Sequence, residues 1–126
     1  MVRRISRLAV AFFVAIVLGS PGNAFALPVA RISYSPASPV VVGQVVTFDG
    51  SASTCDFPPC RYIWAWYYPS GVTGGQMGEG KIVNYAFPAS AGGKTVAVVE
   101  KVVANTRTHG FGSTTVRIVV DPVPSG

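Results

Sequence analysis

The chain of 126 residues has 10 lysines and arginines against 5 acidic residues, a formal net charge of +5. Three of these arginines (Arg3, Arg4 and Arg7) lie at the N-terminus, so the rest of the chain carries 7 basic and 5 acidic residues, a net charge of +2. The other basic residues are scattered and form no run or stripe of the kind that binds a phosphate backbone, so no nucleic-acid partner is expected.

The first 26 residues have the features of a secretory signal peptide. The basic start is followed by an uncharged apolar run of 11 residues, Leu8–Leu18, and Ala24–Ala26 is a small-x-small cleavage site. A membrane-spanning helix needs about 20 apolar residues, so cleavage after Ala26 is favoured over a retained anchor. We therefore expect residues 27–126 to be secreted, with no integral membrane segment after cleavage and a length that suits one domain.

Short β-branched and aromatic segments follow, separated by Gly, Pro, Ser and Asn, and this pattern is typical of an all-β sandwich or barrel. Residues 72–80 contain four glycines and are expected to form an exposed loop, and residues 122–126 a tail. The strands that we expect are Val29–Tyr34, Val40–Val42 (which would pair with the other sheet), Val45–Asp49, Arg61–Tyr67, Lys81–Phe87, Lys94–Val103 and Ser113–Val120.

The alternation within Lys94–Val103 changes phase. Val96 and Val98 share one face of the strand, but Glu100 follows on that same face. A β-bulge near Val98 and Val99 would restore the pattern. An exposed outer half of the strand would explain the sequence equally well.

Cys55 and Cys60 enclose the short segment Asp-Phe-Pro-Pro. A bridge between them would close a loop of six residues, which stabilises the fold by roughly 2 kcal/mol in the chain-entropy model, and export makes it chemically available. Two cysteines and one distant histidine are too few for a zinc site, and the C-x-x-C spacing of redox-active pairs is absent. We therefore predict a structural disulfide.

Asp49 and Asp56 flank the turn DGSAST. Two carboxylates and loop carbonyls are ligands that Ca²⁺ prefers, so these residues are candidate calcium ligands. The favoured interpretation is that Asp49 accepts hydrogen bonds from the turn as an Asx-turn. No cofactor is expected.

Five of the seven residues in Tyr62–Tyr68 are aromatic. Strand alternation places Tyr62, Trp64, Trp66 and Tyr68 on one face and Ile63, Ala65 and Tyr67 on the other. Trp64 is expected in the core, because a central sandwich strand buries aromatic side chains on its inner face. The residues at the strand end are the candidate ligand platform, which would stack on sugar rings or partner side chains: Trp66, Tyr67 and Tyr68. Burial in the core is the alternative for Tyr67 and Tyr68.

No catalytic constellation is present in the sequence. His109, the only histidine, falls in a predicted loop, and nothing in the spacing of Ser113, His109 and Asp121 supports a triad. The five acidic residues lie in five different segments and form no paired-carboxylate site. The chain is therefore not expected to be an enzyme.

Four segments resemble the polycystic kidney disease (PKD) domain, an immunoglobulin-like sandwich: Ser35–Pro39, Val42–Ser53, Tyr62–Trp64 and Tyr85–Phe87. The chain departs from the family at Trp64–Pro69, where the family has W-D-F-G-D-G and this chain keeps only the tryptophan. The resemblance implies an antiparallel sandwich of about seven strands over residues 27–121. It also implies a non-enzymatic extracellular spacer, binding or adhesion module, whose partner would be an extracellular or cell-envelope protein or glycan.

Overall fold

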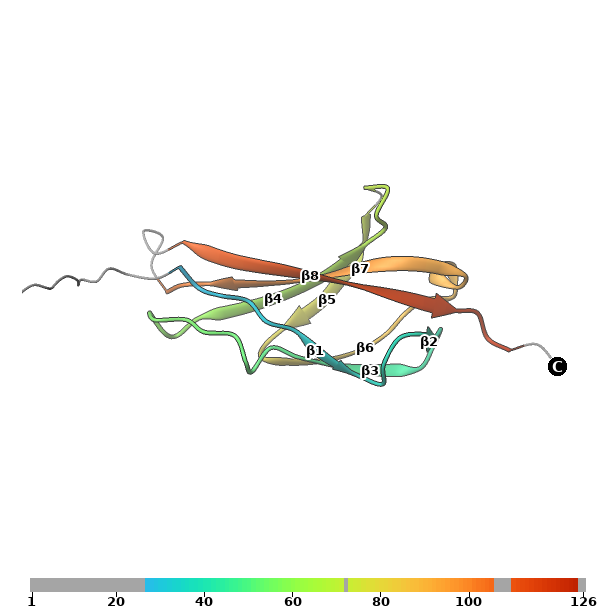
Figure 1. Cartoon of the computed structure of the whole chain (residues 1–126), viewed down its shortest axis with the longest axis horizontal. Helices are drawn as coiled ribbons and strands as arrows, with labels where there is room; N and C mark the ends of the chain where they lie inside the picture. The colour runs from blue at the N-terminus through green and yellow to red at the C-terminus, as the bar shows by residue number, and fades with distance from the viewer. Residues whose placement is uncertain (1–26, 72, 106–109, 125–126) are drawn as a thin grey trace, which may run out of the picture.

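The computed structural model describes residues 27–71, 73–105 and 110–124, and within them the chain is almost entirely β-structure. Three strands form one sheet in the order β1-β3-β6 and five form the other in the order β2-β8-β7-β4-β5. Figure 1 shows β3 and β6 in one layer and β4, β7 and β8 in the other, which confirms the predicted β-sandwich. The strands are β1 (Ser33–Ser35), β2 (Val40–Val41), β3 (Val45–Asp49), β4 (Arg61–Tyr67), β5 (Thr73–Glu79), β6 (Ile82–Ala86), β7 (Lys94–Val103) and β8 (Phe111–Asp121), and a 3-10 turn, η3, spans Ala89–Ala91.

The chain changes sheets at the Ser-Pro segment after β1. Strand β1 pairs with β3 in the small sheet, whereas β2 pairs in parallel with β8 in the large one, which confirms the expected change of sheet. Proline has no N–H to donate to a ladder, and the Ser38 hydroxyl at the crossover accepts a hydrogen bond from the Val119 N–H at 2.9 Å. Regular pairing begins later than predicted, because Val29 forms only an isolated bridge with Thr54.

Strand β7 runs through the centre of the large sheet in continuous register with β4 and β8. Neither explanation of its sequence pattern is correct: the pairing has no bulge at Val98 or Val99, and the second half of the strand is not exposed. Glu100 instead stays in phase with Val98 and Val102 and is completely buried. The apparent change of phase is a buried carboxyl group at a core position.

Residues Thr73–Glu79 form the edge strand β5, so the prediction of an exposed loop there was wrong. The strand pairs with β4, with register shifts beside Ala65 and Tyr67. Gly74 lies directly against the ring of Trp66, and a Cβ atom at this position would overlap it. The glycines that resembled a loop in the sequence therefore let the backbone approach a large side chain closely.

One hydrophobic core lies between the two sheets. Phe48 from the small sheet contacts Trp64 from the large one, with ring centroids 6.0 Å apart, and Phe87 packs edge-on against Trp66 at 5.5 Å. Tilted and edge-to-face contacts of this kind are the favoured geometries of aromatic pairs. The aliphatic part of the core comes from both sheets, from η3 and from the residue after β2: Val40, Val42, Val46, Met77, Val83, Ala91, Val96, Val98, Ile118 and Val120.

Candidate functional site

The aromatic residues of β4 divide into core and rim. Trp64 is fully buried and donates its indole N–H to the Gly80 carbonyl at 2.8 Å. Trp66 is only 3% exposed and donates to the Tyr85 hydroxyl, also at 2.8 Å. Because an indole N–H needs a partner when it leaves water, these two hydrogen bonds let both tryptophans enter the core.

Trp66 is therefore not part of an exposed aromatic platform, and the prediction that it is needs correction. Alternation along the strand also separates the two tyrosines that follow it. Tyr67 pairs with Ala97 and is half-buried on the outer face of the large sheet. Tyr68 stays on the side of Trp66, with ring centroids 5.3 Å apart in an edge-on contact. The three rings do not form one surface, and Tyr68 is the one next to a pocket.

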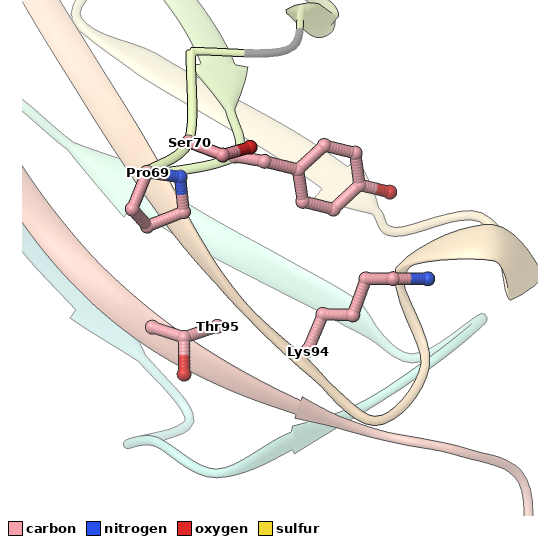
Figure 2. Close-up of a pocket in the computed structure, with 5 residues that line it drawn as sticks. Pro69, Ser70, Lys94 and Thr95 are labelled. Carbon is pink, nitrogen blue, oxygen red and sulfur yellow. The ribbon is translucent and has the colours of Figure 1, made fainter.

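This pocket has a volume of about 500 Å³ and lies where the end of β4 meets the start of β7. Figure 2 shows Pro69 and Ser70, from the segment after β4, on one side of it and Lys94 and Thr95, from β7, on the other. Tyr68 completes the lining. An aromatic ring, a proline ring, two hydroxyls and one ammonium group therefore meet in a single concave surface.

The Ser90 carbonyl holds two of these side chains in place. It accepts a hydrogen bond from Lys94 Nζ at 2.9 Å and one from the Tyr68 hydroxyl at 3.3 Å. The ammonium group lies 5.7 Å from the centroid of the Tyr68 ring, within the range of a cation–π contact. An ammonium group has three N–H donors, so two remain for a ligand. Sequence reasoning missed Lys94 because it is the first residue of a core strand and lies 26 positions from Tyr68.

The predicted disulfide between Cys55 and Cys60 is present. The loop that it closes is tied to the rest of the sandwich, because the Asn105 N–H donates to the Phe57 carbonyl at 3.0 Å. Prolines and the two cysteines of this loop line a second concavity, together with Tyr62 and Lys81.

Asp49 forms the Asx-turn that the sequence predicts. Its Oδ1 atom accepts a hydrogen bond from the Ser51 N–H at 2.7 Å, and the side-chain and backbone hydrogen bonds with Ser51 lower the pKa of the carboxyl group. Asp56 lies exposed in the disulfide loop. No group of three or more His, Cys, Asp or Glu side chains suited to a metal ion occurs in the described parts of the chain. Within the described residues, no third carboxylate therefore joins Asp49 and Asp56 as a calcium ligand.

The buried carboxyl group of Glu100 is hydrogen-bonded to Ser53 of the same turn. The Ser53 hydroxyl lies 2.9 Å from Oε2 of Glu100 and accepts the Arg31 N–H at 2.8 Å. Burial raises the pKa of Glu100, as does the charge of Asp49, while hydrogen bonds from Ser53 and the Arg31 backbone lower it. The carboxyl group is enclosed and has no access to a substrate, so its contacts are structural.

The residues of the hypothetical triad do not come together. Ser113 and Asp121 lie on β8, eight residues apart, which is about 27 Å at the usual rise of a strand. His109 is outside the described residues. Across the described ranges, no helix has the length and apolar character needed to cross a membrane.

Comparison with known proteins gives the fold more firmly than the function. No family model matches the chain, and no curated protein is significantly similar to it. One similar solved structure comes from work on the promiscuous specificity of carbohydrate-binding modules of the β-sandwich superfamily. It superposes with a TM-score of 0.59 at 22% identity over 82% of this chain, which spans 38% of that structure's length.

Proposed function

We propose that the chain is a secreted, non-enzymatic binding module and that the pocket beside Tyr68 binds a glycan. The observation that carries the proposal is the side-chain chemistry of this pocket. A sugar ring has faces of C–H groups, which pack on the rings of Tyr68 and Pro69, and hydroxyl groups, which exchange hydrogen bonds with Ser70, Thr95 and Lys94. Ligand pockets generally combine apolar walls with a few polar groups that fix orientation.

The charge of the pocket narrows the ligand class. Among the described residues that line it, Lys94 is the only charged one, and none of them carries a carboxylate. A carboxylate of an acidic sugar would replace the water around this group and form charge-assisted hydrogen bonds, which are stronger than neutral ones. Glycans that contain uronic acids are therefore the expected ligands, in preference to neutral glycans.

The carbohydrate-binding neighbour supports the proposal at the level of the fold, since a β-sandwich of this kind is a scaffold on which such a site occurs. The Cys55–Cys60 disulfide supports secretion, because disulfides persist mainly in oxidising compartments. The cleavable leader, which lies outside the described residues, stays a prediction.

The experiment is a glycan array followed by calorimetric titration of the full chain, produced in an oxidising compartment. Neighbouring tyrosines provide the matched pair of variants. Tyr68→Ala removes the pocket wall and is expected to weaken binding at least about tenfold, or ~1.4 kcal/mol. Tyr67→Ala alters the outer face of the sheet and is expected to change the affinity by less than about twofold.

The reverse result, with Tyr67→Ala deleterious and Tyr68→Ala neutral, would move the ligand to the outer face of the sheet. Tyr68→Phe serves as the folding control, because it keeps the ring against Trp66 and removes only the hydroxyl. Absence of binding to every glycan on the array would refute the proposal. Turnover of a bound glycan that one point mutation abolishes would refute its non-enzymatic part.

A spacer role of the PKD type is the second candidate, and one observation favours it. The first described residues lie at one end of the sandwich and the C-terminal segment leaves at the opposite end (Figure 1). A domain with this geometry adds its full length to an array of domains. A pure spacer would bind no glycan, so the same array separates the two functions.

A further inference from the structure

The concavity at the disulfide end has a volume of about 420 Å³ and is formed by four separate segments of the chain. The turn after β3, the disulfide loop, the start of β4 and the connection between β5 and β6 all contribute to it. Its lining residues are Ser53, Cys55, Pro58, Pro59, Cys60, Tyr62 and Lys81. None of these described lining residues carries a carboxylate.

The two pockets match in composition. In the pocket beside Tyr68, an ammonium group lies 5.7 Å from the tyrosine centroid, and in the disulfide-end pocket Lys81 Nζ lies 5.9 Å from the centroid of Tyr62. Each pocket adds proline and serine to this tyrosine–lysine pair. Another pair in the described part of the chain, Lys101 over Phe111 at 4.3 Å, lines neither pocket.

The disulfide-end pocket is also held rigidly. The Gly80 N–H donates to the Tyr62 carbonyl at 2.8 Å, which fixes the connection that carries Lys81. Ser53 is anchored to the buried carboxyl group of Glu100, and the disulfide fixes the loop opposite. A site whose walls are ordered before binding avoids the entropy cost of ordering them.

The geometry of β4 makes the pockets independent. Tyr62 is the second residue of the strand and Tyr68 follows its last residue, so the two tyrosines are about 20 Å apart at the rise of a strand. The side chains between them on this face, Trp64 and Trp66, are buried in the core. No continuous groove through the core joins the pockets, and each must take a ligand segment of its own.

We propose that the disulfide-end pocket is a second site for the same ligand class, so that one domain binds two segments of uronic-acid glycan. This inference rests on the proposed function, because the ligand class comes from the pocket beside Tyr68. In the second site Lys81 faces the sugar carboxylate, while Tyr62 and the two prolines pack on the ring faces. Two sites at opposite ends let the domain bridge neighbouring glycan chains.

The test is calorimetric titration of the full chain with tetrasaccharides of galacturonic, glucuronic and mannuronic acid. The expected stoichiometry is two ligands per chain. Lys81→Met and Lys94→Met should each leave one site at the wild-type affinity and weaken the other at least about tenfold, and the double variant should have both sites weakened. Lys101→Met, the matched control on the third lysine–aromatic pair, should still bind two.

A stoichiometry of one that Lys94→Met abolishes and Lys81→Met leaves unchanged would overturn the second site and leave the proposed function standing. Absence of binding by all three tetrasaccharides would overturn the second site and the preference for uronic-acid glycans, whereas glycan binding beside Tyr68 is tested by the array. Cross-linking gives an independent readout, since linked sites gain strength from multivalency. The wild-type chain should cluster a long polyuronate in light scattering, and either single variant should bind the polymer without clustering it. Clustering by the Lys81→Met variant would contradict the proposal.

Discussion

Gly50 lies in the DGSAST turn, at a position whose surroundings leave no room for a side chain. A Cβ atom there would overlap the Glu100 carboxylate and lie 3.1 Å from the ring of Trp64. Both neighbours are buried in the core, and a shift of the Glu100 carboxylate would break its hydrogen bond with Ser53. Glu100 therefore explains why glycine occupies position 50, within the segment that resembles PKD domains.

Gly50→Ala is expected to destabilise the protein by about 2 kcal/mol, the usual cost of overpacking a core. The measurement is urea unfolding followed by tryptophan fluorescence. Gly43→Ala is the matched control, because its Cβ would meet no atom within 4 Å and only the positive φ of +79° opposes it. The explanation fails if the two variants lose the same stability.

The burial of Glu100 predicts that the free energy of unfolding decreases as the pH rises above the ordinary pKa of a glutamate. Burial raises its pKa above the ordinary 4.5, so over the interval between the two values the folded state binds more protons than the unfolded state. Stability from this group is therefore complete below about pH 4.5 and falls as the pH rises through the raised value. Asp49 has the opposite dependence, but its lowered pKa confines its effect to more acidic solution.

Urea unfolding at a series of pH values from about 4.5 to 8 tests this expectation. Wild-type stability should decline as the pH rises from about 4.5 and level off above the raised pKa of Glu100. Glu100→Gln should remove that decline, because an amide keeps an acceptor for Ser53 and does not titrate. Glu79→Gln, an exposed change at the ion pair with Arg61, should preserve the slope. An unchanged slope in Glu100→Gln would refute the assignment.

At the level of the elements, β5 depends on two adjacent glycines with different surroundings. A Cβ atom at Gly74 would enter the ring of Trp66, whereas one at Gly75 would lie 3.5 Å from the nearest atom of that ring, an ordinary contact. Gly74→Ala should cost about 2 kcal/mol and shift Trp66 fluorescence toward the red, as β5 moves off the indole. Gly75→Ala should leave the spectrum unchanged. Equal spectra for both variants would show that β5 tolerates a side chain against Trp66.

The sequence predicted the strands that are rich in β-branched and aromatic side chains. Those with the predicted bounds are Val45–Asp49, Arg61–Tyr67 and Lys94–Val103. Strand β5 was missed because glycines carry no side chain to show a period. The prediction for Glu100 was wrong because a charged residue interrupts the alternation of apolar side chains. Only the structure shows that Ser53 lies beside it and that a carboxyl group can be buried there.

The candidate site was only partly predictable. Alternation correctly placed Tyr68 on the face of Trp66 and Tyr67 on the other. It could not show that Trp66 is covered by β5, which turns a candidate platform residue into a core residue. The two lysines that complete the pockets come from distant segments: Lys94 reaches Tyr68 because β7 pairs with β4, and Lys81 lies on the connection between β5 and β6.

At the scale of the whole molecule, the two sheets share a single core. Phe48 and Val83 from the small sheet pack with Trp64, Trp66 and the aliphatic residues of the large sheet. Neither sheet can bury its apolar face without the other, so we expect them to unfold together, as small single domains usually do. Tryptophan fluorescence and far-ultraviolet circular dichroism should therefore give coincident urea transitions.

A ligand that binds only the folded state should move both transitions equally. At a free concentration one hundred times the dissociation constant, one occupied site adds about 2.7 kcal/mol to the free energy of unfolding. Two independent sites of equal affinity add about twice this amount, because their binding free energies sum. Lys81→Met, which keeps the site beside Tyr68 and weakens the other at least about tenfold, should then gain at most about three-quarters of the wild-type stabilisation from a uronic-acid tetrasaccharide. A ligand-induced shift of one spectroscopic transition without the other would show that the sheets are separate folding units.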